Sequence, residues 1–295
     1  MRRGLNFLAA VLCGLVVFGG REAGAVTLIS DSRLTLPEFA QKSGQDPNLF
    51  EARYAATGIV VCSGVSATAQ LTVRNDVVTT AAHAFFDPDG NPRGDLSTCT
   101  FTIDIGGIHH TVPLDVASLR VGSRNPYPVS PVHDWAVVRL KEKVQEARPY
   151  GLGTTDHGAQ IVMLAHRHLG WVHDGLKAIE ACAIRTTERV DALSARELDI
   201  DCSAGAGASG SAIMLPGAAC AMVGIYVGWR STHPQSPGLF SQTHLNFGVA
   251  VEGPFRQAIL EMTNGPEPTP VDASPTEIAQ APVNSDRGEG RASLP

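Results

Sequence analysis

Positive charge is scarcer than negative charge in this sequence, and this limits the partners to expect. The chain has 23 lysines and arginines against 29 aspartates and glutamates, so its formal net charge is −6 at pH 7. A protein that binds nucleic acid or an anionic membrane surface through its charge needs a basic excess. The composition therefore gives no reason to expect either partner.

Long apolar runs are also missing. The run Phe7–Phe18 is too short to span a bilayer. It follows Arg2 and Arg3 and precedes the small residues Ala23-Gly24-Ala25, which is the pattern of a secretory signal peptide at residues 1–25. We therefore expect a secreted or periplasmic protein with no membrane attachment in its mature form. Cleavage removes a net charge of +2, which takes the net charge from −6 to −8.

No group of side chains has the spacing of a metal site. His109 and His110 are neighbours, so on a strand they point to opposite faces. His166 and His168 share a face, but no nearby cysteine or carboxylate completes a tetrahedral zinc set. The acidic turn Asp87–Asn91 lacks the glycine and glutamate positions of an EF-hand loop. We expect no metal and no cofactor.

The middle of the chain has no internal repeat and shows an all-β pattern. Short runs rich in β-branched residues alternate with clusters of Gly, Pro, Asn and Asp. The runs are Gly58–Cys62, Asp76–Thr80, Cys99–Ile105, Trp135–Leu140, Gln160–Ala165, Met222–Gly228 and Phe247–Val251. The length of this region fits one two-barrel unit better than two independent domains.

The two ends of the chain differ from the middle. Gly253–Met262 has a proline near its start and apolar residues at helical spacing, which predicts a closing helix. Residues 263–295 are rich in Pro and polar residues, which predicts a disordered tail. Residues 26–54 form either a short propeptide or an ordered N-terminal arm, with a short helix at Leu34–Ala40 and a turn at Gln45–Asn48.

Three motifs in chain order carry the chemistry. His83 ends the run Thr-Thr-Ala-Ala-His, Asp134 begins the run Asp-Trp-Ala-Val-Val, and Ser209 lies in Gly-Ala-Ser-Gly-Ser. A serine hydroxyl needs an imidazole to take its proton, and the imidazole needs a carboxylate to fix its tautomer. Each motif alone has an ordinary explanation as a buried histidine, a strand start or a flexible turn. Together and in this order they predict a catalytic triad.

These motifs resemble those of the chymotrypsin/trypsin-like serine peptidases, in particular the bacterial secreted branch with the glutamyl endopeptidases and related trypsin-like peptidases. The resemblance covers residues 55–262 and implies two six-stranded antiparallel β-barrels with a C-terminal helix. It implies a secreted serine endopeptidase acting on protein or peptide substrates through an acyl-enzyme, with His83 as base, Asp134 as orienting group and Ser209 as nucleophile. The backbone N–H groups of Gly207 and Ser209 then form the oxyanion hole.

The resemblance also implies a specificity pocket. The carried-over residues are Ser203, Tyr226, Gly228, Trp229 and Gly248. No carboxylate lies between Cys202 and Ser209, which disfavours the selection of Arg or Lys. Tyr226 stands where glutamyl endopeptidases have a histidine, so a preference for glutamate is not supported either. We expect cleavage after a neutral residue, small or apolar.

Five cysteines remain after the signal peptide, and the expected oxidising compartment favours disulfides. In the resembled family a bridge closes just after the histidine; here Cys62 and Cys99 flank the histidine, with Cys99 as a displaced partner. A bridge between Cys182 and Cys202 resembles that of bacterial members. Cys220 is left over, and its apolar neighbours favour a buried small hydrophobe.

Two other functions compete with that of a serine peptidase of this fold. An α/β-hydrolase needs an acid and then a histidine after its serine, and no Asp or Glu lies between Ser209 and His244. A catalytically silent double-barrel binding module is the alternative from another class, although such relatives normally lose a member of the triad.

Ala208 also differs from the aspartate of members that are activated by insertion of a new N-terminus. We therefore expect an oxyanion loop that forms without such insertion, and any inhibition by residues 26–54 to act by covering the cleft.

Overall fold

The computed structural model describes residues 31–265, apart from Gly170, Asp174, residues 190–194, residues 218–219 and Gln235. The expected signal peptide and nearly all of the expected C-terminal tail lie outside the described residues.

The helices and strands follow one another in this order. They are β1 (Leu34–Thr35), α1 (Leu36–Lys42), α2 (Pro47–Arg53), β2 (Thr57–Cys62), β3 (Val65–Thr72), β4 (Arg74–Thr80), β5 (Thr100–Ile105), β6 (Ile108–Val121), β7 (Ala136–Leu140), β8 (Gly151–Leu152), β9 (Gln160–Ala165), β10 (Ala178–Arg189), β11 (Arg196–Ile200), β12 (Ala212–Met214), β13 (Ala221–Ser231), β14 (His244–Ala250) and α3 (Gly253–Asn264). Short 3-10 turns are η1 (Ala82–Ala84), η2 (Leu96–Thr98) and η3 (Pro131–His133).

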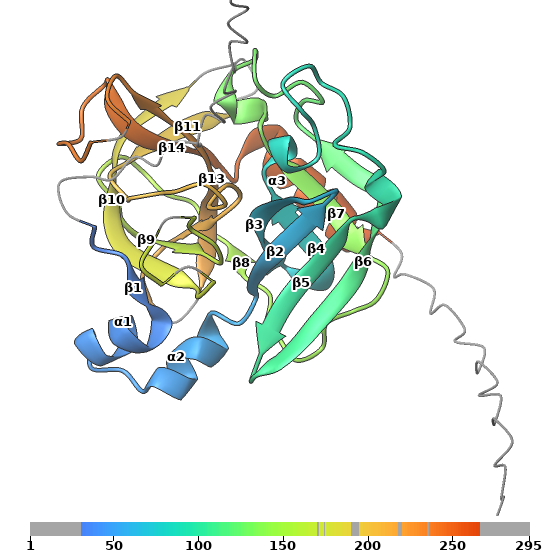
Figure 1. The fold of residues 1–295 in the computed structure, drawn as a ribbon, viewed down its shortest axis with the longest axis horizontal. Helices are drawn as coiled ribbons and strands as arrows, with labels where there is room; N and C mark the ends of the chain where they lie inside the picture. The colour runs from blue at the N-terminus through green and yellow to red at the C-terminus, as the bar shows by residue number, and fades with distance from the viewer. Residues whose placement is uncertain are drawn as a thin grey trace, which may run out of the picture.

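The first barrel is a closed antiparallel ring in the order β2-β3-β4-β7-β6-β5. Its strands point apolar side chains into one core, as the period of two along a strand allows. Fully or almost fully buried members of this core are Val60, Leu71, Val78, Phe101, Leu114 and Val138. In Figure 1 this barrel lies on the right.

The second barrel runs β9-β10-β11-β14-β13-β12 and closes because β12 and β10 both pair with β9. β1 extends it beside β10, and β8 adds a parallel pair to β13. Helix α3 then packs on the first barrel, where Phe255 stacks on Trp135 with ring centroids 5.2 Å apart. The expected fold of two six-stranded antiparallel barrels with a C-terminal helix is confirmed.

The N-terminal arm, residues 31–54, is ordered and lies below the second barrel in Figure 1. Its first helix begins at Leu36 rather than at Leu34, because Thr35 caps it: the Thr35 hydroxyl accepts from the Glu38 N–H, and the Glu38 carboxylate accepts from the Thr35 N–H. Phe39 and Phe50 stack at 5.5 Å and join the two arm helices. None of the described helices is long and apolar enough to cross a membrane.

Candidate active site

Two neighbouring strands bring His83 and Asp134 together. His83 lies in η1 directly after β4, and Asp134 follows η3 just before β7. These two strands pair with each other, with Thr80 opposite Ala136. The end of one strand and the start of the other therefore meet, and the two side chains face each other across the pair.

The Asp134 carboxylate holds His83 through both of its oxygens. Oδ2 lies 2.6 Å from His83 Nδ1, and Oδ1 accepts the backbone N–H of His83 at 2.9 Å. Asp134 is only 7% exposed, so this contact is shielded from water. A neutral His83 that donates from Nδ1 keeps Nε2 free to accept a proton, which is the state that a general base needs.

Ser209 is fixed by the glycine that follows it. Gly210 has φ of +85°, and a Cβ there would lie 2.1 Å from the Thr68 carbonyl oxygen and 2.3 Å from Thr80 Oγ1. Only glycine fits this approach to the first barrel. The Gly210 N–H also donates to the carbonyl of Tyr226 in β13 at 2.7 Å. Ser209 is thus held between the two barrels.

Gly207 adopts a left-handed conformation with φ of +89°. Its carbonyl accepts from the N–H of Thr68 at 3.2 Å and from the Thr68 hydroxyl at 2.9 Å. Within the part of the chain that the structure describes, neither the Gly207 N–H nor the Ser209 N–H donates a hydrogen bond. Two backbone donors beside Ser209 are therefore available to a developing negative charge.

A cleft of about 560 Å³ is lined by His83, Asp134 and Ser209, the three residues of the expected triad. The first barrel and its loops contribute Val65, Ser66, Ala67, His83, Ala84, Arg93, Pro126, Tyr127, Val129, Pro131 and Asp134 to its lining, and the second contributes Gly205, Ala206, Gly207, Ser209, Tyr226, Val227, Gly228, Trp229 and Phe247. The cleft thus lies between the two barrels. No described residue of the N-terminal arm lines it.

Only three of the five expected specificity residues line the cleft. Tyr226, Gly228 and Trp229 line the cleft, whereas Ser203 and Gly248 do not. Ser203 is fully buried. A Cβ on Gly248 would lie 2.5 Å from both Ile213 Cδ1 and the Ile225 carbonyl oxygen, which places this residue against the barrel core.

Phe247 is a lining residue that the sequence analysis missed. Its ring packs on Gly228, where a Cβ would lie 2.8 Å from the ring atom Cζ. The guanidinium of Arg230 covers the ring at 4.3 Å from its centroid. Strand alternation did not reveal it, because the sequence analysis expected Gly248 to face the pocket and the neighbouring residue then points away.

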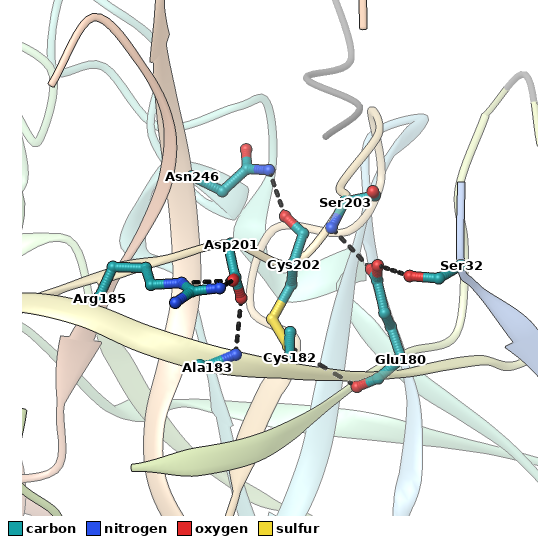
Figure 2. The surroundings of a disulfide bond; sticks show 9 residues. All are labelled: Ser32, Glu180, Cys182, Ala183, Arg185, Asp201, Cys202, Ser203 and Asn246. Carbon is teal, nitrogen blue, oxygen red and sulfur yellow. Dashed lines mark hydrogen bonds and ion pairs between the residues drawn. A yellow bond between two sulfur atoms is a disulfide. The ribbon is translucent and has the colours of Figure 1, made fainter. Parts of the chain in front are cut away.

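The described residues contain two disulfides. One joins Cys62 to Cys99 in the first barrel, and the other joins Cys182 in β10 to Cys202, which begins the segment leading to Ser209 (Figure 2). This is the pairing expected from the sequence. Cys220 is free and buried, and burial raises the pKa of its thiol. Among the described residues no group of three or more His, Cys, Asp or Glu is placed to hold a metal ion.

No protein-family model matches the sequence, and no curated protein matches it. Solved structures do match: a Glu endopeptidase has a TM-score of 0.55 at 13% identity, covering 81% of this chain and 100% of that one. The human heparin-binding protein has a TM-score of 0.54 at 14% identity, covering 74% of this chain and 96% of that one. Sequence identities this low establish only the fold. The names of the two neighbours also describe different activities, since one is an endopeptidase and the other a binding protein. In fold, the chain belongs with the chymotrypsin/trypsin-like proteins.

Proposed function

We propose that the protein is a serine endopeptidase that hydrolyses peptide bonds through an acyl-enzyme intermediate. The observation that carries the proposal is the two-point hold of Asp134 on His83 in a cleft that also contains Ser209. The protease fold supports it. The two disulfides support a site of action outside the cytoplasm, either secreted or periplasmic.

In the first half of the reaction, Ser209 Oγ attacks the substrate carbonyl carbon while His83 Nε2 takes the hydroxyl proton. Asp134 stabilises the resulting imidazolium. The carbonyl oxygen becomes an oxyanion that accepts from the N–H groups of Gly207 and Ser209. When the C–N bond breaks, His83 gives its proton to the leaving amine, and the acyl group stays on Ser209.

In the second half, water attacks the acyl carbon and His83 takes one of its protons. The same two N–H groups hold the second oxyanion. The bond to Ser209 Oγ then breaks, His83 returns the proton to that oxygen, and the acid product leaves. Neither half of this reaction, as proposed, uses a metal ion or a cofactor.

The cleft walls support cleavage after a neutral residue. Tyr226, Trp229 and Phe247 are lining residues of the cleft that contains Ser209, and the Phe247 ring packs on Gly228. The carboxylate among the described lining residues is that of Asp134, which is engaged by His83. A substrate lysine or arginine therefore meets no unpaired negative charge in this lining, and an apolar or small side chain fits its surface.

The test is covalent labelling of the protein from Val26 onward with a fluorophosphonate, followed by mass-spectrometric mapping of the adduct. We expect the label on Ser209, its loss in Ser209→Ala and its retention in Ser66→Ala, a matched control because Ser66 also lines the cleft. A label on another serine contradicts the mechanism. No label on the folded protein favours the silent binding module instead.

A further inference from the structure

The back of the segment Ser203–Ser209 is held by a buried carboxylate. Glu180 in β10 is 3% exposed, and its Oε2 accepts the backbone N–H of Ser203 at 2.6 Å. Its other oxygen, Oε1, accepts the hydroxyl of Ser32 from the N-terminal arm at 2.5 Å. Figure 2 shows the carboxylate between these two partners, beside the disulfide of Cys182 and Cys202. One side chain thus connects the arm to the start of the segment.

A second connection lies a few residues further along. The Arg33 side chain is 6% exposed, and its Nη1 donates to Nδ1 of His168 at 3.0 Å. An arginine only donates, so this nitrogen of His168 accepts. Burial and, second, the charge of Arg33 lower the pKa of His168 to about 3, which agrees with a neutral ring. The next residue, Leu169, donates its N–H to the Ala206 carbonyl at 2.8 Å.

The packing at this second connection is close. A Cβ added at Gly205 would be in van der Waals contact with both side chains, at 3.6 Å from Arg33 Nη1 and 3.7 Å from His168 Nδ1. The arm itself is attached by backbone pairing, because Leu34 pairs with Ile179, the neighbour of Glu180. Ser32 and Arg33 therefore directly precede a strand, β1, that is paired to β10 of the second barrel.

We propose that Ser32 and Arg33 of the N-terminal arm, acting through Glu180 and His168, are positioning residues that hold the segment Ser203–Ser209 in its catalytic shape. The inference rests on the proposed function and adds to it a role for the arm. Of the two held points, Ala206 directly precedes Gly207, the first proposed oxyanion donor, and Ser203 lies four residues before Gly207. Ala208 has no charge with which to anchor the segment from within.

Loosening this hold affects turnover more than substrate binding. Oxyanion donors act only within about 2.7–3.1 Å of the developing charge, and loss of one donor costs about 10²–10³ in kcat. We expect Arg33→Ala and Glu180→Ala each to lower kcat by roughly 10- to 100-fold, since the donors are displaced rather than removed. KM should change by less than about 3-fold, because no described residue of the arm lines the cleft, whose wall includes Trp229 and Phe247.

The kinetic test uses the full mature chain and a small ester substrate, with rates expressed per titrated active site. Glu180→Gln keeps an oxygen that accepts from the Ser203 N–H, so it should restore most of the kcat that Glu180→Ala loses. Arg53→Ala is the matched control: this arm guanidinium binds Gln45 and lies over the Phe50 ring, away from the nucleophile segment. Equal kcat per site in the wild type, Arg33→Ala and Glu180→Ala overturns the proposal.

An activity-independent readout separates this proposal from the proposed function. Amide hydrogen exchange of peptides covering residues 203–211 should be faster in Arg33→Ala and Glu180→Ala and unchanged in Arg53→Ala. If the wild type takes no label on Ser209, the proposed function fails, but the exchange data still test the hold on the segment. Unchanged exchange in both variants, or exchange that rises equally over the whole chain, overturns it.

Discussion

Replacing Asp134 by asparagine tests the triad most directly, because the carboxylate uses both oxygens on one residue. Oδ2 meets His83 Nδ1 at 2.6 Å, and Oδ1 meets the His83 backbone N–H at 2.9 Å. An asparagine has one accepting oxygen and one donating NH₂ group. If its oxygen stays with the backbone N–H, its NH₂ group faces Nδ1. The favoured tautomer then carries its proton on Nε2, where it cannot take a proton from Ser209.

The expected loss follows from this change of tautomer. The same substitution in a Ser-His-Asp triad lowers kcat by about 10⁴, which corresponds to about 5 kcal/mol of transition-state stabilisation. The fold should survive, because asparagine has the shape of aspartate. The assay is kcat on a small ester substrate together with the free energy of unfolding in urea.

The control is Asp46→Asn. Asp46 caps α2 by accepting the Leu49 N–H at 3.0 Å, and asparagine caps helices about as well as aspartate. This variant makes the same chemical change outside the cleft and should keep full activity. A loss of less than about 10-fold in Asp134→Asn, with the control unaffected, would refute the assignment of Asp134 as the orienting group.

Three further predictions concern other parts of the site. Ser209→Ala and His83→Ala should each lower kcat by roughly 10⁶-fold, because triad members act as a unit; active-site titration and turnover of the same ester measure this. Gly210→Ala should abolish activity and destabilise the fold, because the new Cβ meets the Thr68 carbonyl at 2.1 Å; urea unfolding that matches the wild type contradicts this. Burial raises the pKa of Glu180 from 4.5 to about 7, so the folded state binds its proton more tightly than the unfolded state. The stability that Glu180 contributes is complete below pH 4.5 and falls as the pH rises through about 7, by up to about 3 kcal/mol, and Glu180→Gln should flatten this part of the unfolding profile.

The predictable part of the fold was the part with local apolar patterning. All seven runs taken from the sequence coincide with strands. β3 is harder to find because its residues are largely small or polar, and Gln70 is fully buried there. Its side-chain NH₂ group donates to a partner strand, at the Thr79 carbonyl (3.0 Å) and the Thr79 hydroxyl (2.7 Å). A polar strand of this kind is stable inside a barrel for reasons that its own sequence does not contain.

The candidate site, like the fold, has one part that the sequence predicts and another part that depends on the tertiary structure. The triad motifs are short, and each includes the neighbours that fix it. The pocket residues depend on register, and β13 has an irregularity that places Tyr226 opposite Gly248 but Gly228 opposite Phe247. A one-residue offset between paired strands changes which side chain faces the cleft. An assignment by distance along the chain therefore chose Gly248, which faces the core, and missed its neighbour Phe247.

The contacts of the arm explain how an uncharged nucleophile loop can hold its shape. A segment that leaves two N–H groups unpaired toward a cleft needs other bonds to fix it. The bonds of Gly207 with Thr68 and of Gly210 with Tyr226 use groups that are in place once the barrels form. The bonds at Ser203 and Ala206 depend on Glu180 and on the loop of His168, and the arm contacts both. In the proposed mechanism, docking of the arm therefore couples directly to the order of the loop, and this gives a chain without a charged residue before Ser209 a way to fix its oxyanion hole.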